Sequence, residues 1–254
     1  MTALGFALAL LVGLSLGLLG GGGAILTVPI FHYVMGFDVK LAVPMSLVVV
    51  GITSGVGAVR FWRTGTLIPR VLLAFGPAAI VGALLGAELG LLVSGRVQLT
   101  VFAAVLLLAA ISMYLGPVWA PIDPATQQHT VVPPKNPMVL EVLVGAAVGT
   151  LTGFVGVGGG FLYVPTLVLL AGLPMKEAIG TSLGLIMISC LAGVVRYQGS
   201  LELDWRTVAI FTAVALLGLA VGSRLVLHAS QRVLRRSFAA LLLLMGGFVL
   251  ALGR

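Results

Sequence analysis

The chain has 254 residues, of which 60% are hydrophobic and 8% are charged, and its mean hydropathy is +1.22. Soluble domains carry about 25% charged residues, so this composition excludes an ordinary water-soluble fold and indicates a protein embedded in lipid. The net charge of +7 would suit nucleic acid in a soluble protein. Here the basic residues stand one or two at a time between apolar runs, as membrane loop anchors do, and we expect no nucleic-acid partner.

Ten apolar segments follow one another, which predicts an all-α integral membrane protein. Most have about 17 to 23 residues and would reach about 25–35 Å as helices, enough to cross a hydrocarbon core of about 30 Å. We expect the first to be a retained helix, because no Lys or Arg precedes Lys40 as a signal peptide would require. The long segments are 3–19, 41–59, 71–93, 97–115, 138–155, 178–195, 207–227 and 237–253.

Two further segments, 24–35 and 161–173, would reach only about 18–20 Å. Each follows a glycine-rich break. The sequence GGGGAILTVP at positions 20–29 returns at positions 156–165 as GVGGGFLYVP. Adjacent glycines break a helix, so these breaks predict non-helical backbone at two equivalent places.

The same offset relates the two halves of the chain well beyond the breaks. It pairs Lys40 with Lys176, Ser46 with Ser182 and Arg60 with Arg196. We therefore predict a duplicated unit, with membrane repeats at 1–116 and 137–254. Residues 117–136, rich in proline and polar side chains, form a linker with no sign of its own fold.

Each half holds five segments. Whether the number of membrane crossings in each half is odd or even decides whether the repeats are inverted or parallel. If all five cross, or if the first two form a re-entrant hairpin, the number of crossings is odd and the repeats are inverted. If each broken pair counts as one crossing, the repeats are parallel. We favour inversion, with the broken helices at the centre of the molecule.

Glycine-rich backbone inside a membrane must be buried by protein or reached by water. The helices that follow the breaks have free N–H groups and a partial positive charge at that end, which favours an anion. The competing interpretation is close helix packing through small residues, which we favour for Gly13, Gly17, Gly82 and Gly86. The predicted substrate-binding residues are Gly21, Gly22, Gly23, Ala24, Ser46, Gly158, Gly159, Gly160, Thr181 and Ser182.

Three charged residues are candidates for gating or coupling. Arg60 and Arg196 end equivalent segments, where an arginine either guards an anion pathway or extends to the membrane interface. Glu88 lies near the end of an apolar run. It is the candidate for a coupling proton, against the alternatives of an ion pair or an interfacial position.

Enzymatic chemistry has no support in the sequence. The three histidines lack a recognisable motif, and there is no Walker sequence for a nucleotide. The single Cys190 excludes an intramolecular disulfide and a cysteine metal cluster. We expect no enzyme activity, no cofactor and no metal.

The glycine cluster, the proline that follows it and the run Ala178-Ile-Gly-Thr-Ser-Leu183 resemble the TauE/SafE sulfite exporter family, also called the toluene sulfonate uptake permeases. The resemblance covers essentially the whole chain. The first half departs from it at Val43-Pro44-Met45-Ser46, where Gly-Thr-Ser would be the closer match. The resemblance implies a permease of the cell membrane that carries small sulfur-containing or organic anions such as sulfite or sulfonates.

Two other functions remain open on the sequence. A passive anion channel would use the same paired breaks. A membrane scaffold has no need of them. A secondary transporter, moving a small anion and driven by an ion gradient or by the substrate gradient, is the leading interpretation.

Overall fold

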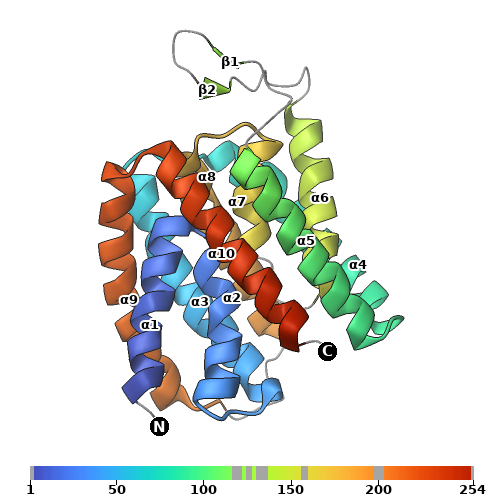
Figure 1. The fold of residues 1–254 in the computed structure, drawn as a ribbon, viewed down its shortest axis with the longest axis vertical. Coiled ribbons are helices and arrows are strands. Elements are labelled where there is room, and N and C mark those ends of the chain that lie inside the picture. Colours follow the sequence, from blue (N-terminus) through green and yellow to red (C-terminus); the bar gives the residue numbers. More distant parts are fainter. Residues whose placement is uncertain are drawn as a thin grey trace.

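The structure is a computed structural model that describes residues 3–115, 122–123, 128–129, 137–155, 160–196 and 203–252. Within these ranges it consists of ten α-helices, one π-helical turn and two short strands (Figure 1). The first half contains α1 (Ala3–Leu19), α2 (Gly22–Pro29), η1 (Ile30–Val34), α3 (Val39–Arg63), α4 (Pro69–Leu91) and α5 (Gly95–Leu115). The second contains α6 (Pro137–Val155), α7 (Gly160–Leu169), α8 (Met175–Arg196), α9 (Trp205–His228) and α10 (Gln231–Leu252).

Each of the ten predicted segments coincides with one α-helix, with ends that differ by a few residues, and η1 continues α2 to the end of its segment. The linker prediction differs in one respect. Its described residues include β1 (Ile122–Asp123) and β2 (Gln128–His129), which pair antiparallel beyond one end of the helical bundle (Figure 1). The polar, proline-rich composition of the linker carries no signal for this pairing.

Four described helices are long and apolar enough to cross a membrane. They lie at Lys40–Arg63, Pro69–Gly86, Met175–Val194 and Trp205–His228. Their outer faces carry large apolar side chains, including Leu73 and Leu217, which are 74% and 64% exposed. Such exposed apolar surface fits contact with lipid tails rather than water.

The first glycine break ends α1 and reverses the chain. Gly20 has a φ of +75°, a conformation that side-chain-bearing residues rarely adopt. Its N–H donates to the Leu16 carbonyl at 2.9 Å, which closes the last turn of α1. The chain then returns as α2, which lies beside α1 (Figure 1). The break therefore produces a helical hairpin.

The main helix contacts join one half of the chain to the other. Helix α1 packs along α9, and its repeat counterpart α6 packs along α4, the counterpart of α9. Helices α3 and α8 pack on each other, as do α5 and α10, and α2 and α7. Every one of these contacts maps onto itself or onto another when the halves are interchanged, so the pattern of contacts is the same from either half.

Glycines allow the helices of the two halves to pack closely. A Cβ atom at Gly17 of α1 would lie 2.7 Å from the Leu219 carbonyl oxygen of α9. At Gly82 and Gly86 of α4 it would overlap the carbonyl oxygens of Ala146 and Thr150 on α6. These contacts agree with the interpretation of these glycines as packing residues.

The directions of the helices are visible in Figure 1. Helix α1 starts at the N label, at the end of the bundle opposite the linker strands, and runs toward them. Helix α6 starts beside the linker and runs the other way, and α10 ends at the C label. The first helices of the two halves thus run in opposite directions along the long axis.

Candidate functional site

The first glycine break meets Gly160, the first residue of α7, in the interior. A Cβ atom at Gly21 would overlap the carbonyl oxygen of Gly160 and lie 2.6 Å from the Cα of Phe161. A Cβ atom at Gly160 would lie 3.3 Å from the Cβ of Ala24. Backbone from one half therefore touches backbone from the other, and side chains larger than hydrogen at Gly21 are excluded. Gly158 and Gly159 lie outside the described residues.

The amino end of α2 is buried and has no side-chain cap. Gly21, Gly22 and Gly23 are all buried, and Gly21, the N-cap, has no side chain that could accept from the helix. The N–H of Ala24 donates to the Gly21 carbonyl at 3.3 Å. The first N–H groups of any helix lack partners within the helix, so this end presents donors and a partial positive charge inside the protein.

Ser15 also faces this end, and sequence reasoning missed it. A Cβ atom at Gly22 would lie 2.8 Å from the Ser15 Oγ and would overlap a Cδ atom of Leu241. A single hydroxyl in an apolar helix carries little signal, which is why the sequence does not single out Ser15. Its place one helical turn before the end of α1 is the clue that could have found it.

The amino end of α7 has a more enclosed, aromatic setting. Residues Gly160 to Leu167 are all buried, and a Cβ atom at Gly160 would lie 2.9 Å from the Ile186 side chain. The Phe161 ring packs edge-on against Phe102, with ring centroids 5.3 Å apart. The Tyr163 hydroxyl shares a hydrogen bond of 2.7 Å with Ser189. This side of the centre is filled by side chains.

The predicted hydroxyl residues have different surroundings. A Cβ atom at Gly20 would lie 2.5 Å from the Ser182 Oγ, so Ser182 lies at the first break, and its hydroxyl donates to the Ile179 carbonyl at 2.8 Å. The Thr181 hydroxyl instead accepts from the Ile68 N–H at 3.1 Å, in the connection between α3 and α4. Ser46, the counterpart of Ser182, is 4% exposed on α3.

The predicted charged residues lie at helix ends. Arg60 is half-buried in the last turn of α3, and Arg196 ends α8, where its side chain is outside what the structure describes. Glu88 is exposed on α4. It follows Gly86 by two residues, which places it on the side of the helix opposite the glycine face that contacts α6. Glu88 is therefore not among the groups gathered at the breaks.

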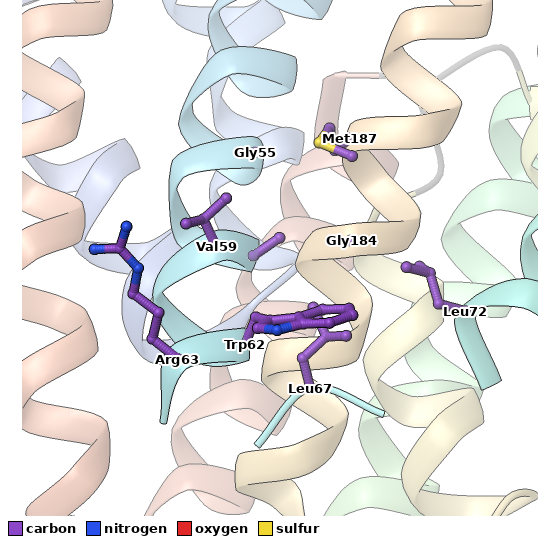
Figure 2. Close-up of a pocket in the computed structure, with 9 residues that line it drawn as sticks. Gly55, Val59, Trp62, Arg63, Leu67, Leu72, Gly184 and Met187 are labelled. Carbon is purple, nitrogen blue, oxygen red and sulfur yellow. The ribbon is translucent and has the colours of Figure 1, made fainter. Parts of the chain in front are cut away.

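A separate cavity of about 380 Å³ lies between α3 and α8, lined by apolar side chains from both. Figure 2 shows Val59 and Trp62 of α3 on one side and Met187 of α8 on the other, with Arg63 extending away from the Trp62 ring. Leu67 and Leu72 complete the lining. Apart from Arg63 the lining is almost entirely apolar, so this cavity offers few donors for an anion.

Comparison with known proteins gives a consistent result. A family model described as "Sulfite exporter TauE/SafE" matches residues 5–249. A "Probable membrane transporter protein" of Xylella fastidiosa (strain 9a5c) is 31% identical over 244 residues, which are 94% of this chain and 91% of that protein. "Probable membrane transporter protein YdhB" of Bacillus subtilis is 25% identical over 187 residues, covering 74% and 75% of the two chains.

A relative from a third organism is also similar to this chain. "Probable membrane transporter protein MJ0441" of Methanocaldococcus jannaschii is 26% identical over 200 residues, covering 75% of this chain and 71% of its own. No solved structure matches the chain significantly.

Proposed function

The chain belongs to the sulfite exporter TauE/SafE family and is therefore a multi-pass membrane transporter, and we propose that it is a secondary carrier of small oxyanions, such as sulfite or organic sulfonates, in the plasma membrane. The observation that carries this proposal is the contact of the two glycine breaks at Gly21 and Gly160. It puts the uncapped amino end of α2 in the interior, beside the other repeat.

The surroundings of this helix end favour an anion over a cation. The atoms nearest to Gly20–Gly23 come from apolar side chains, from the backbone of α1, α7 and α8, and from the Ser15 and Ser182 hydroxyls. None of these residues has an ionised acidic side chain, and the helix N–H groups and the Ser15 hydroxyl can donate to an oxyanion. In a water-excluded interior such donors act more strongly than in water.

Transport proceeds by alternating access between inverted repeats. The exchange of helix partners between the halves and the opposite directions of α1 and α6 in Figure 1 support this arrangement. One helical hairpin and its neighbours rock against the other half around the fixed meeting point of the breaks. The anion is then open to one side of the membrane at a time.

The test uses purified protein in proteoliposomes with radiolabelled sulfite, an aromatic sulfonate and a carboxylate as probes. A carrier gives saturable uptake that is accelerated by unlabelled sulfite on the opposite side. Unsaturable flux without this acceleration would identify a passive channel. Absence of flux for every anion in folded, correctly inserted protein would favour a scaffold and overturn the proposal.

A further inference from the structure

The Ser15 hydroxyl differs from the other buried hydroxyls that flank the breaks. Ser15 is 7% exposed, and its Oγ has no hydrogen-bond partner among the described residues. Buried hydroxyls on the adjacent helices α2 and α9 donate to carbonyls of their own helices: Thr27 to Gly23 at 2.9 Å, and Ser223 to Leu219 at 2.7 Å. An unmade hydrogen bond in the interior is costly, which calls for a partner that is supplied from outside the chain.

The orphan hydroxyl lies beside a buried helix end at which no described side chain forms a cap. A Cβ atom at Gly22 would be 2.8 Å from the Ser15 Oγ, so the hydroxyl lies against the first residue of α2. The Gly22 and Gly23 N–H groups belong to the first turn of that helix, which has no intrahelical acceptor for them. The Ser15 hydroxyl therefore lies beside the residue whose N–H, like that of Gly23, has no acceptor within the helix. The Ser54 Oγ also lacks a partner among the described residues, but it lies in the middle of α3, far along the helix from either end.

Leu241 of α10 covers the same spot. A Cβ atom at Gly22 would overlap its Cδ atom, so this side chain packs against the first residue of α2, next to the Ser15 hydroxyl. Leu241 is half-buried, and the contacting atom is the far end of a rotatable side chain. Such a side-chain end can move by a change of rotamer, without backbone movement.

The second half lacks an equivalent of this arrangement among its described residues. The position that corresponds to Ser15 is Leu151, which has no hydroxyl and is 37% exposed. The neighbouring Thr152 hydroxyl is already bonded to the Gly149 carbonyl at 2.8 Å. The repeat symmetry is therefore broken at the position where a donor would be added.

We infer that Ser15 is an oxyanion-binding residue, which donates to the anion together with the Gly22 and Gly23 N–H groups, and that Leu241 limits the size of the anion. This inference rests on the proposed transport of small oxyanions and names the part of the site that holds them. The ligand is a small oxyanion headgroup, sulfite-like or the sulfonate end of a larger molecule. Because all of these donors are uncharged, the site has no permanent positive charge that would slow the release of the anion.

The test compares Ser15→Ala with Ser223→Ala in sulfite counterflow. Ser223 lies on α9, which packs along α1, and its hydroxyl is satisfied by its own helix, so it is a matched control. We expect Ser15→Ala to raise the KM for sulfite about ten-fold or more, as loss of a hydrogen bond to a charged group should, while Ser223→Ala stays within about two-fold. Sulfite should also raise the melting temperature of the detergent-solubilised wild type and Ser223→Ala, but raise that of Ser15→Ala far less.

Leu241→Ala tests the size limit with benzenesulfonate and sulfite as probes. We expect the ratio of benzenesulfonate to sulfite uptake to rise several-fold, and the lipid-facing control Leu244→Ala, at a position 69% exposed, to leave it unchanged. Unchanged sulfite KM in Ser15→Ala and an unchanged ratio in Leu241→Ala, in protein whose wild type transports sulfite, would overturn the inference and leave the proposed function intact. A wild type that neither binds nor moves any anion would instead overturn the proposed function.

Discussion

Gly21 of the first repeat packs directly on the backbone of Gly160 of the second, with a Cβ position at Gly21 only 2.6 Å from the Cα of Phe161. Gly21 and Gly160 are 139 positions apart in the sequence (160 − 21), yet no side chain lies between them. Motion of one half against the other at this point would therefore change a backbone contact next to the buried end of α2.

Gly22→Leu should abolish anion uptake. Its side chain would meet Leu241 and the Ser15 hydroxyl at the first turn of α2, where we propose that the anion binds. The measurement is sulfite uptake into proteoliposomes, with protein amount and melting temperature recorded. Gly247→Leu is the control, because nothing lies within 4 Å of a Cβ there. Normal uptake by a folded Gly22→Leu protein would count against the site.

Gly149→Ala should destabilise the bundle without acting on substrate directly. Its methyl group would overlap the Ala79 carbonyl oxygen in the contact of α6 with α4, a case of overpacking that typically costs about 1–3 kcal/mol. Gly76→Ala on α4 is the comparison, since its nearest neighbour would be 3.6 Å away. Thermal unfolding in detergent should show a lower melting temperature for Gly149→Ala alone; equal values would refute the packing role.

Thr181→Val should lower stability and leave the sulfite KM unchanged. The Thr181 hydroxyl accepts from the Ile68 N–H at 3.1 Å, and valine keeps the shape but removes the acceptor. An unpaired backbone N–H costs about 1–3 kcal/mol when it is buried. The measurement pairs a melting curve with a counterflow KM. A KM that rises with no loss of stability would assign Thr181 to the anion site.

Asp204 should make the start of α9 sensitive to acid. The Thr207 hydroxyl and the Thr207 backbone N–H donate to its carboxylate at 2.7 and 3.1 Å and hold the pKa of that carboxyl below its usual range. Because the pKa is lower in the folded than in the unfolded state, the capping carboxylate stabilises the folded protein at pH values above the unfolded-state pKa of about 3.9. This stabilisation is lost as pH falls through the folded-state pKa.

The measurement is the melting temperature of the wild type and Asp204→Ala at neutral pH and at about pH 3. The variant should melt lower at neutral pH, because an N-cap residue is lost. The gap should narrow in acid, since the stabilisation by the carboxylate is lost progressively as pH falls below the unfolded-state pKa. A gap that stays constant across this range would contradict the assignment.

Glu88→Gln should spare sulfite exchange and remove the response of uptake to a pH gradient, if a proton is the coupling ion. The residue is exposed on α4 and apart from the breaks, so its loss should not weaken anion binding. Glu141→Gln on α6 is the control for a lost carboxylate. Unchanged pH-driven uptake in Glu88→Gln would rule out the coupling role and leave the anion site standing.

The sequence by itself determined the positions of the helices and of the first break. Apolar runs and adjacent glycines are local signals, since a helix needs only its own backbone partners and Gly20 needs only its own freedom to adopt a φ of +75°. The fixed offset between the halves likewise predicted the duplication. The glycine cluster and the proline that follows it indicated the family through residue types and spacing alone.

The tertiary structure alone decided which surfaces meet. Helices that are apolar all round carry no hydrophobic stripe to mark their buried face, so the pairing of α1 with α9 and of α4 with α6 could not be derived from periodicity. For the same reason, the sequence could not tell that Thr181 turns to Ile68 while Ser15 turns to Gly22. A hydroxyl on such a helix has no preferred direction until its neighbours are packed around it.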